Sequence, residues 1–198
     1  MARIVDVNEK KKFISEKALD VFSSKGYYKT NMDDIAKACE VGRTTLYDYF
    51  KNKEDIFLYT MESFFGMLDS KIDEVTRIES LDAINKIKNI FNVVLEAYIE
   101  LAPMSLVILD TWAVLYRDKP KLLGDTKMRM HRYRELLSDI LEQGVEKKVI
   151  KKLDPNSMGI TLLSLIDSLI FALQITKNTD DIELFVEDVS LILDGLRY

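Results

Sequence analysis

Few of the side chains that build reactive or metal-binding sites occur in this sequence. Among its 198 residues there is one cysteine, Cys39, and one histidine, His131. A lone cysteine cannot form an intrachain disulfide, which is typical of a reducing compartment, so we expect a cytoplasmic protein. With one thiol, one imidazole and no glycine-rich phosphate loop, the sequence predicts no metal, no other cofactor and no enzyme activity. Paired carboxylates could still meet in the folded chain.

Proline and glycine are also scarce, at 3 and 7 residues. Together with abundant Leu, Ile, Lys and Glu, this composition predicts an all-α protein. The longest apolar-rich run, residues 160–175, contains Asp167 and is shorter than the roughly 20 residues that a bilayer span needs. Residues 1–12 lack the apolar centre of a signal peptide. We therefore expect no membrane partner.

The charge of the chain is distributed unevenly. The formal net charge is −5 at pH 7. Residues 1–60 contribute 11 basic and 10 acidic side chains, whereas residues 61–198 contribute 17 and 23. The acidity thus belongs to the larger C-terminal part, and a DNA site in the N-terminal part would have to be a local basic patch.

Helix signals are dense in the first third of the chain. Apolar spacing predicts helices at residues 8–25, 32–39, 43–49 and 53–76. Gly26 follows the first helix where a left-handed cap is expected, and Asn31 with Asp34 forms a capping-box pattern before the second. Two short helices joined by the turn at 40–42 are the helix-turn-helix arrangement, whose second helix can enter the major groove of DNA.

The segment "ALDVFSSKGYYKTNMDDIAKACEVGRTTLYDYFKNKEDI" makes residues 9–56 resemble the DNA-binding domain of the TetR/AcrR family of transcriptional regulators. Its most specific part is "LYDYFKNKEDI". The resemblance implies a homodimer in which each chain has a three-helix DNA-binding head, here residues 1–52, and a helical effector-binding and dimerisation body, here residues 53–198. It also implies that the effector usually weakens DNA binding.

The residues that the resemblance places against DNA have suitable side chains. They are Thr30, Asn31, Arg43, Thr44, Thr45, Tyr47, Tyr49 and Lys53, with Tyr28 and Lys29 just before them able to reach the DNA backbone. An arginine can fork onto guanine or phosphate, and a lysine near a helix start can meet a phosphate. Leu46 and Phe50 are expected to hold the second helix of the motif to the head.

The turn departs from the family pattern at two positions. Where relatives commonly have Ala-Gly-Val-Ser, this chain has Cys39-Glu40-Val41-Gly42. Glu40 replaces a glycine suited to a left-handed backbone, which costs on the order of 1 kcal/mol. Gly42 replaces a hydroxyl N-cap at a cost of a few tenths of a kcal/mol. Cys39 is expected to be a small buried residue, because no second cysteine can resolve an oxidised form.

The rest of the chain reads as helices at residues 81–101, 104–117, 122–149, 155–176 and 180–196. Large adaptable side chains on the middle helices suit an apolar pocket with few polar anchors, and the family binds effectors among these helices. The expected effector-binding residues are Phe64, Phe65, Met67, Phe91, Tyr98, Met104, Asp110, Trp112 and Tyr116. Each could instead be an ordinary core residue, and Asp110 a hydrogen-bonded buried carboxylate without a ligand. The charged run 127–134 is interpreted as a solvated face.

The last two helices carry apolar residues over most of their circumference, which is more than one packed side needs. Pairing with a twofold mate as a four-helix bundle would bury the second side, and the resemblance implies the same interface. The expected dimer-interface residues are Leu165, Asp167, Ser168, Leu169, Phe185, Val189 and Ile192. Asp167 is expected to be a structural polar group, and Ser168 to allow close helix approach.

These patterns predict a homodimeric, ligand-responsive DNA-binding transcriptional regulator. The expected mode is repression, with release from a palindromic double-stranded DNA operator by a small apolar or amphipathic effector. Two alternatives stay open from the sequence: a constitutive DNA-binding protein without effector, and a helical enzyme or carrier.

Overall fold

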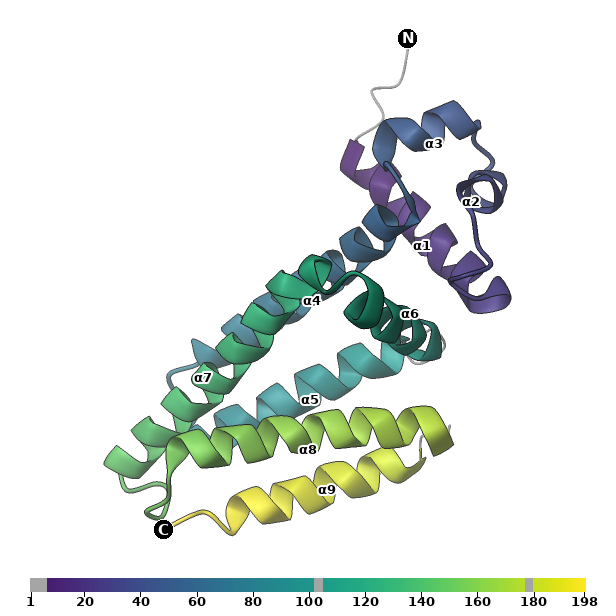
Figure 1. Ribbon diagram of the computed structural model, residues 1–198. Helices are drawn as coiled ribbons and strands as arrows, with labels where there is room; N and C mark the ends of the chain where they lie inside the picture. Colours follow the sequence, from purple (N-terminus) through teal and green to yellow (C-terminus); the bar gives the residue numbers. More distant parts are fainter. Residues whose placement is uncertain (1–6, 102–104, 177–179) are drawn as a thin grey trace. The chain divides into compact units, whose positions relative to one another are not determined.

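The structure is a computed structural model and describes residues 7–101, 105–176 and 180–198 (Figure 1). The helices are α1 (Val7–Lys25), α2 (Met32–Ala38), α3 (Arg43–Tyr49), α4 (Lys53–Thr76), α5 (Ala83–Leu101), α6 (Ser105–Asp118), the 3-10 helix η2 (Pro120–Leu123), α7 (Gly124–Glu146), α8 (Pro155–Thr176) and α9 (Asp180–Asp194). In the described ranges the only β pairing is an isolated bridge between Ile150 and Arg197. The predicted all-α fold is confirmed. None of the helices described combines the length and hydropathy that a bilayer span requires.

The chain divides into two compact units. The first comprises the described residues up to Met67 and those of α6 up to Val114. The second comprises the chain from Leu68 to the end of α5 and from Leu115 onward. Since α4 and α6 each contribute residues to both units, the division is not a single cut in the sequence. The predicted domain boundary after residue 52 coincides with the start of α4 and stays a prediction.

The core of the first unit forms where α1 meets the helix-turn-helix segment. Ile14, Ala18 and Phe22 of α1 are fully buried, at the i, i+4, i+8 spacing of one helix face. Phe13 of α1 does not belong to this core: it is 39% exposed, and the ammonium of Lys10 lies 5.0 Å from the centre of its ring. Successive residues of an α-helix are rotated by about 100° around its axis. Phe13, one position before Ile14, therefore lies at the edge of the buried helix face.

In the second unit, α7 and α8 approach each other closely because of one glycine. A Cβ atom on Gly159 of α8 would lie 2.6 Å from the Oγ atom of Ser138 on α7. Ser138 is 7% exposed, and its hydroxyl donates to the carbonyl of Arg134. The contact with α8 buries Ser138, because Gly159 of α8 has no side chain at that point.

Hydrogen bonds and ion pairs of the C-terminal residues connect the start of α5, the end of α9 and the α7–α8 connection. The guanidinium of Arg197 donates to Asp82, just before α5, at 2.8 Å and to Asp194 at 3.1 Å. Lys88 of α5 also pairs with Asp194 at 2.8 Å. The backbone of Lys151, in the α7–α8 connection, donates to the carbonyl of Leu196. The Arg197 guanidinium holds the pKa of the Asp82 carboxyl below its usual range, so this cluster stabilises the fold above about pH 4 and loses that effect as Asp82 is protonated.

Candidate nucleic-acid interface

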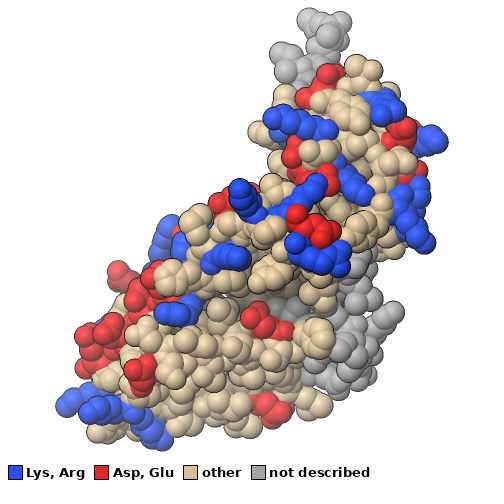
Figure 2. Space-filling view, in the orientation of Figure 1, with Lys and Arg blue, Asp and Glu red and all other residues tan. Residues whose placement is uncertain are grey.

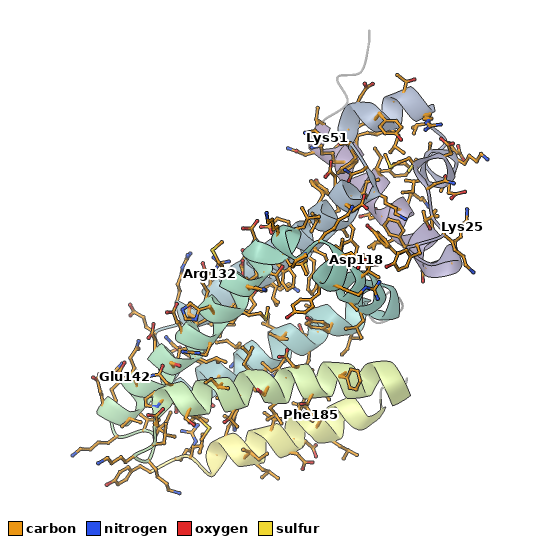
Figure 3. The ribbon with its side chains drawn as sticks, in the orientation of Figure 1. Lys25, Lys51, Asp118, Arg132, Glu142 and Phe185 are labelled. Carbon is orange, nitrogen blue, oxygen red and sulfur yellow. The ribbon has the colours of Figure 1, made fainter. Side chains whose placement is uncertain are left out.

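The helix-turn-helix segment begins with the capping box that its sequence predicts. The backbone N–H of Asp34 donates to Oδ1 of Asn31 at 3.0 Å, and the N–H of Asn31 donates to Oδ2 of Asp34 at 2.9 Å. Lys25, labelled in Figure 3, adds an ion pair to the same carboxylate. These bonds hold the pKa of Asp34 below its usual range, with the Lys25 bond as the largest cause. The start of α2 is therefore fixed on the end of α1.

The turn between α2 and α3 has the geometry that its departures from the family pattern predict. Glu40 has a φ of 54°, in the left-handed region, and Gly42 is the N-cap of α3 without a side-chain bond. The backbone N–H of Val41 reaches back to the carbonyl of Ala36 at 3.0 Å and closes the turn. Cys39 is 3% exposed, as expected of a small buried residue, and burial raises the pKa of its thiol.

Because Glu40 carries a side chain in a left-handed position, Glu40→Gly should stabilise the protein. We expect the free energy of unfolding, measured in urea, to rise by up to about 1 kcal/mol. The steric cost of a side chain at positive φ should exceed the conformational entropy that glycine adds to the unfolded chain. Lys148, with a φ of 56°, is a second site of the same kind, and Lys148→Gly should act in the same direction. Lys37→Gly, within α2, should instead lose about 1 kcal/mol. Equal effects of all three variants would contradict this account of the turn.

Helix α3 offers its polar side to solvent and its apolar side to the head. Leu46 is fully buried and Phe50, just after the helix, is 4% exposed, as predicted. The side chains available on the other side are Arg43, Thr44, Thr45 and Tyr47, which are exposed, and Tyr49, which is half-buried. Figure 2 shows basic side chains spread over this unit among acidic ones, so the positive charge is local rather than continuous.

The guanidinium of Arg43 is held in place by two neighbours. The Nε atom of Arg43 lies 3.2 Å from Oδ1 of Asp33 on α2. The Cζ atom of the guanidinium lies 5.6 Å from the centre of the Tyr47 ring. Tyr47, and after it Asp33, raise the pKa of Arg43, which therefore keeps its charge. The sequence does not predict the role of Asp33, because nothing in the spacing of residues 33 and 43 indicates that α2 and α3 bring the two side chains together.

The loop before α2 contains one correction to the expected DNA contacts. Tyr28 is 56% exposed and Lys29 is exposed, so both side chains lie at the surface of the head. Thr30 is only 2% exposed, and its hydroxyl donates to the carbonyl of Gly26 at 2.8 Å. Burial and this bond do not favour a DNA contact by the Thr30 hydroxyl, which instead stabilises the loop itself. Asn31 is exposed, but its side chain is engaged as the cap of α2.

Lys53, also expected at DNA, begins α4 and points its ammonium into the head. The Nζ atom donates to the carbonyls of Tyr27 at 2.7 Å, Tyr28 at 3.2 Å and Thr30 at 2.8 Å. It also lies 4.5 Å from the centre of the Tyr27 ring. This geometry does not favour a phosphate contact, since three carbonyl oxygens already surround the charge. Lys51, labelled in Figure 3, is exposed just before α4.

The residues expected to bind an effector have different environments. Phe64 and Phe65 are buried with their rings 5.4 Å apart, and Phe91 is 2% exposed. Met67 is 38% and Tyr116 60% exposed, which is not the environment of an enclosed apolar site, so we leave these two out of it. Met104 lies outside the described residues, as do the side chains of Asp110 and Trp112.

Tyr98 of α5 lies near a polar cluster that the sequence reading did not find. The hydroxyl of Tyr133 on α7 donates to Asp69 of α4 at 2.6 Å, and Nε of Arg129 lies 3.3 Å from the same carboxylate. Arg129 is 6% exposed, so the solvated face predicted for residues 127–134 does not include this side chain. Burial, followed by the charge of Asp167, raises the pKa of Tyr98 to about 12. Asp69 and Tyr133 are 64 positions apart, so no local pattern links them.

The hollows described within the second unit are small. One, of about 80 Å³, lies between α5 and α9 and is lined by Phe91, Leu95 and by Phe185, which Figure 3 labels. The other, of about 280 Å³, is an open groove that includes Asp82, Lys86 and Lys147. Ligand sites usually enclose about 300–1,000 Å³, so neither of these two hollows fits a drug-sized effector.

On α8 and α9 the structure divides the expected interface residues into two groups. Leu169 and Val189 are 6% and 3% exposed, and so belong to the core of the protomer. Asp167, Ser168 and Ile192 are exposed, while Leu165 and Phe185 are half-buried. The large apolar side chains that remain exposed on these helices are Ile160, Phe171, Leu184, Leu191 and Ile192, at 47–69%. Figure 2 shows few charged side chains over this part of the second unit.

Comparison with known proteins agrees with this geometry. The family of bacterial regulatory proteins named after tetR matches residues 14–60. The HTH-type transcriptional regulator YhgD of Bacillus subtilis is 26% identical over 172 residues, covering 82% of this chain and 83% of that protein.

Solved structures match over nearly the whole chain. A putative TetR-family regulator from Syntrophomonas wolfei has a TM-score of 0.74 and 25% identity, covering 96% of each chain. The fatty acid degradation regulator FadR from Bacillus halodurans has a TM-score of 0.71 and 25% identity, covering 94% of this chain and 95% of that one. Residues 14–60 thus carry the segment by which the tetR family of bacterial regulatory proteins is defined, and the described chain has the fold of TetR-family transcriptional regulators.

Proposed function

We propose that the protein is a homodimeric repressor that binds a near-palindromic operator and leaves it when a small amphipathic molecule binds the second unit. The observation that carries the proposal is the exposed side of α3. Arg43, Thr44, Thr45 and Tyr47 point away from the buried residues Leu46 and Phe50. Arginine, hydroxyl and aromatic side chains together can bond to base edges and phosphates in the major groove.

Two copies of the head would explain how so short a helix reads a specific site. A seven-residue helix contacts only a few base pairs, and a dimer doubles the contact by reading two half-sites about 34–36 Å apart. The exposed apolar side chains of α8 and α9 supply a surface for such pairing. Burying apolar area of this kind is the main driving force for association.

The polar cluster of the second unit supports an amphipathic effector. Phe91 and Tyr98 are aromatic, and Arg129 and Tyr133, which pair with Asp69, bring polar groups into the same unit. A ligand with an apolar chain and an anionic or carbonyl head would suit both kinds of group. The fatty acid degradation regulator with the same fold favours fatty acyl compounds as the first to test.

The experiment is release of operator DNA by defined ligands. Free fatty acids, acyl thioesters and a sterol-type ligand should be titrated into the protein–operator complex, with a sugar phosphate as a polar control. An effector at 100 times its Kd should also raise the free energy of unfolding by about 2.7 kcal/mol. Tyr133→Phe should weaken release while leaving operator binding without ligand unchanged. Operator binding that no ligand class affects would favour a constitutive DNA-binding protein.

A further inference from the structure

The ammonium of Lys53 lies at a point where three backbone carbonyls converge. Its oxygen partners belong to Tyr27, Tyr28 and Thr30, at 2.7–3.2 Å, and the face of the Tyr27 ring closes one side. A lysine ammonium has three N–H donors, which equals the number of these carbonyls. The carbonyls converge because Gly26, with a φ of 83°, turns the chain sharply at the end of α1.

The position of Lys53 in α4 makes this arrangement informative. A positive side chain in the first turn of a helix is disfavoured by the helix dipole, whose positive end lies there. The acidic residues Glu54 and Asp55 follow it in the same turn, as the dipole favours. The three carbonyls of the loop offset the unfavourable position of the Lys53 charge, so this loop supplies stabilising partners for its side chain.

The loop held by Lys53 leads directly into the DNA-reading helices. Asn31, the residue after Thr30, is the N-cap of α2. From there α2 positions α3 through the turn and through the Asp33–Arg43 pair. A displacement of residues 27–30 relative to the start of α4 therefore displaces α2, and with it the side chains of α3.

We propose that Lys53 is a positioning residue for DNA binding: its ammonium ties the start of α4 to the 27–30 loop and so sets the placement of α2 and α3, without contacting a phosphate. The inference rests on the proposed function for its consequence at DNA, but the tie itself is a property of the free protein. A phosphate contact would require the ammonium to leave the carbonyls that hold it.

Two substitutions separate the two roles. Lys53→Met keeps most of the aliphatic part of the side chain and removes the charge. Lys53→Arg keeps the charge, but the planar guanidinium cannot direct three N–H donors from a single nitrogen to the three carbonyls. We expect both variants to lower operator affinity about tenfold at every salt concentration, with an unchanged slope of log K against log salt. A phosphate contact would instead lower the slope by about 1.8 in Lys53→Met, about 0.9 for each of the two copies on the operator, and leave Lys53→Arg near the wild type. That pattern would overturn the proposal.

Two further readouts distinguish positioning from a general loss of folding. In the free protein, amide hydrogen exchange of residues 27–34 should accelerate in Lys53→Met and stay unchanged in Lys51→Met, the matched control on the exposed lysine. Affinity for non-specific DNA should stay within about twofold of the wild type, because the basic surface is retained. Equal losses of affinity for operator and non-specific DNA, or unchanged hydrogen exchange of residues 27–34, would refute the proposed role of Lys53. If the wild-type protein binds no operator, the proposed function fails, while the exchange result still decides the role of Lys53.

Discussion

Replacing Phe171 and Leu191 together with aspartate should convert the protein to monomers and abolish operator binding. The two side chains are 58% and 69% exposed on α8 and α9, and the loss of their burial against a second copy would be joined by repulsion between the new carboxylates. A monomer reads one half-site, so operator affinity should fall at least about 100-fold. Sedimentation and operator titration would measure the two effects.

A matched control separates the interface from a general effect of adding charge. Met128 on α7 is 62% exposed, so Met128→Asp introduces the same group on another helix of the unit and should leave a dimer with normal operator affinity. Leu169→Glu is a poorer test, because Leu169 is 6% exposed and its replacement would unfold the protomer itself. A fully dimeric Phe171→Asp/Leu191→Asp protein would show that these helices do not form the interface.

The second large effect is expected at the recognition helix. Tyr47→Ala should reduce operator affinity about 10- to 100-fold, since it removes a ring that is 42% exposed and supports the guanidinium of Arg43. The free energy of unfolding should change by no more than about 0.5 kcal/mol, because the side chain is on the surface. Fluorescence anisotropy with labelled operator and urea unfolding would measure both quantities.

Tyr198→Ala is the control for Tyr47→Ala. Tyr198 is 84% exposed, and its substitution should affect neither operator affinity nor stability. Tyr47→Phe separates the contribution of the ring from that of the hydroxyl. If the ring supports Arg43, this variant should keep most of the operator affinity. Normal operator affinity in Tyr47→Ala would remove α3 from the DNA interface.

Local patterns in the sequence predicted the local structure well. The Asn31–Asp34 capping box, the left-handed Glu40 and the uncapped start of α3 at Gly42 are each determined by residues within one turn of the chain. The ends of helices were less predictable. The helix expected at residues 122–149 is instead a 3-10 turn followed by α7, which ends at Glu146 because Lys148 takes a left-handed conformation.

The roles of individual side chains are hardest to predict where residues distant in the sequence determine their surroundings. Thr30 and Lys53 are of types that suit DNA, and only the folded loop shows that their polar atoms are engaged by carbonyls, 23–26 positions away in the case of Lys53. Arg129 looks like a surface residue in its own helix, and Asp69 of α4 explains its burial. A residue's type indicates what it can bind, but its partners depend on tertiary packing.

Selection of genomic DNA fragments by the purified protein tests the central claim most directly. If the protein is a dimeric regulator that reads DNA with α3, sequencing of the retained fragments should yield an inverted repeat with half-sites about one helical turn apart. The same selection with the Tyr47→Ala variant should lose that repeat. Recovery of fragments without a shared motif by the wild-type protein would contradict the account.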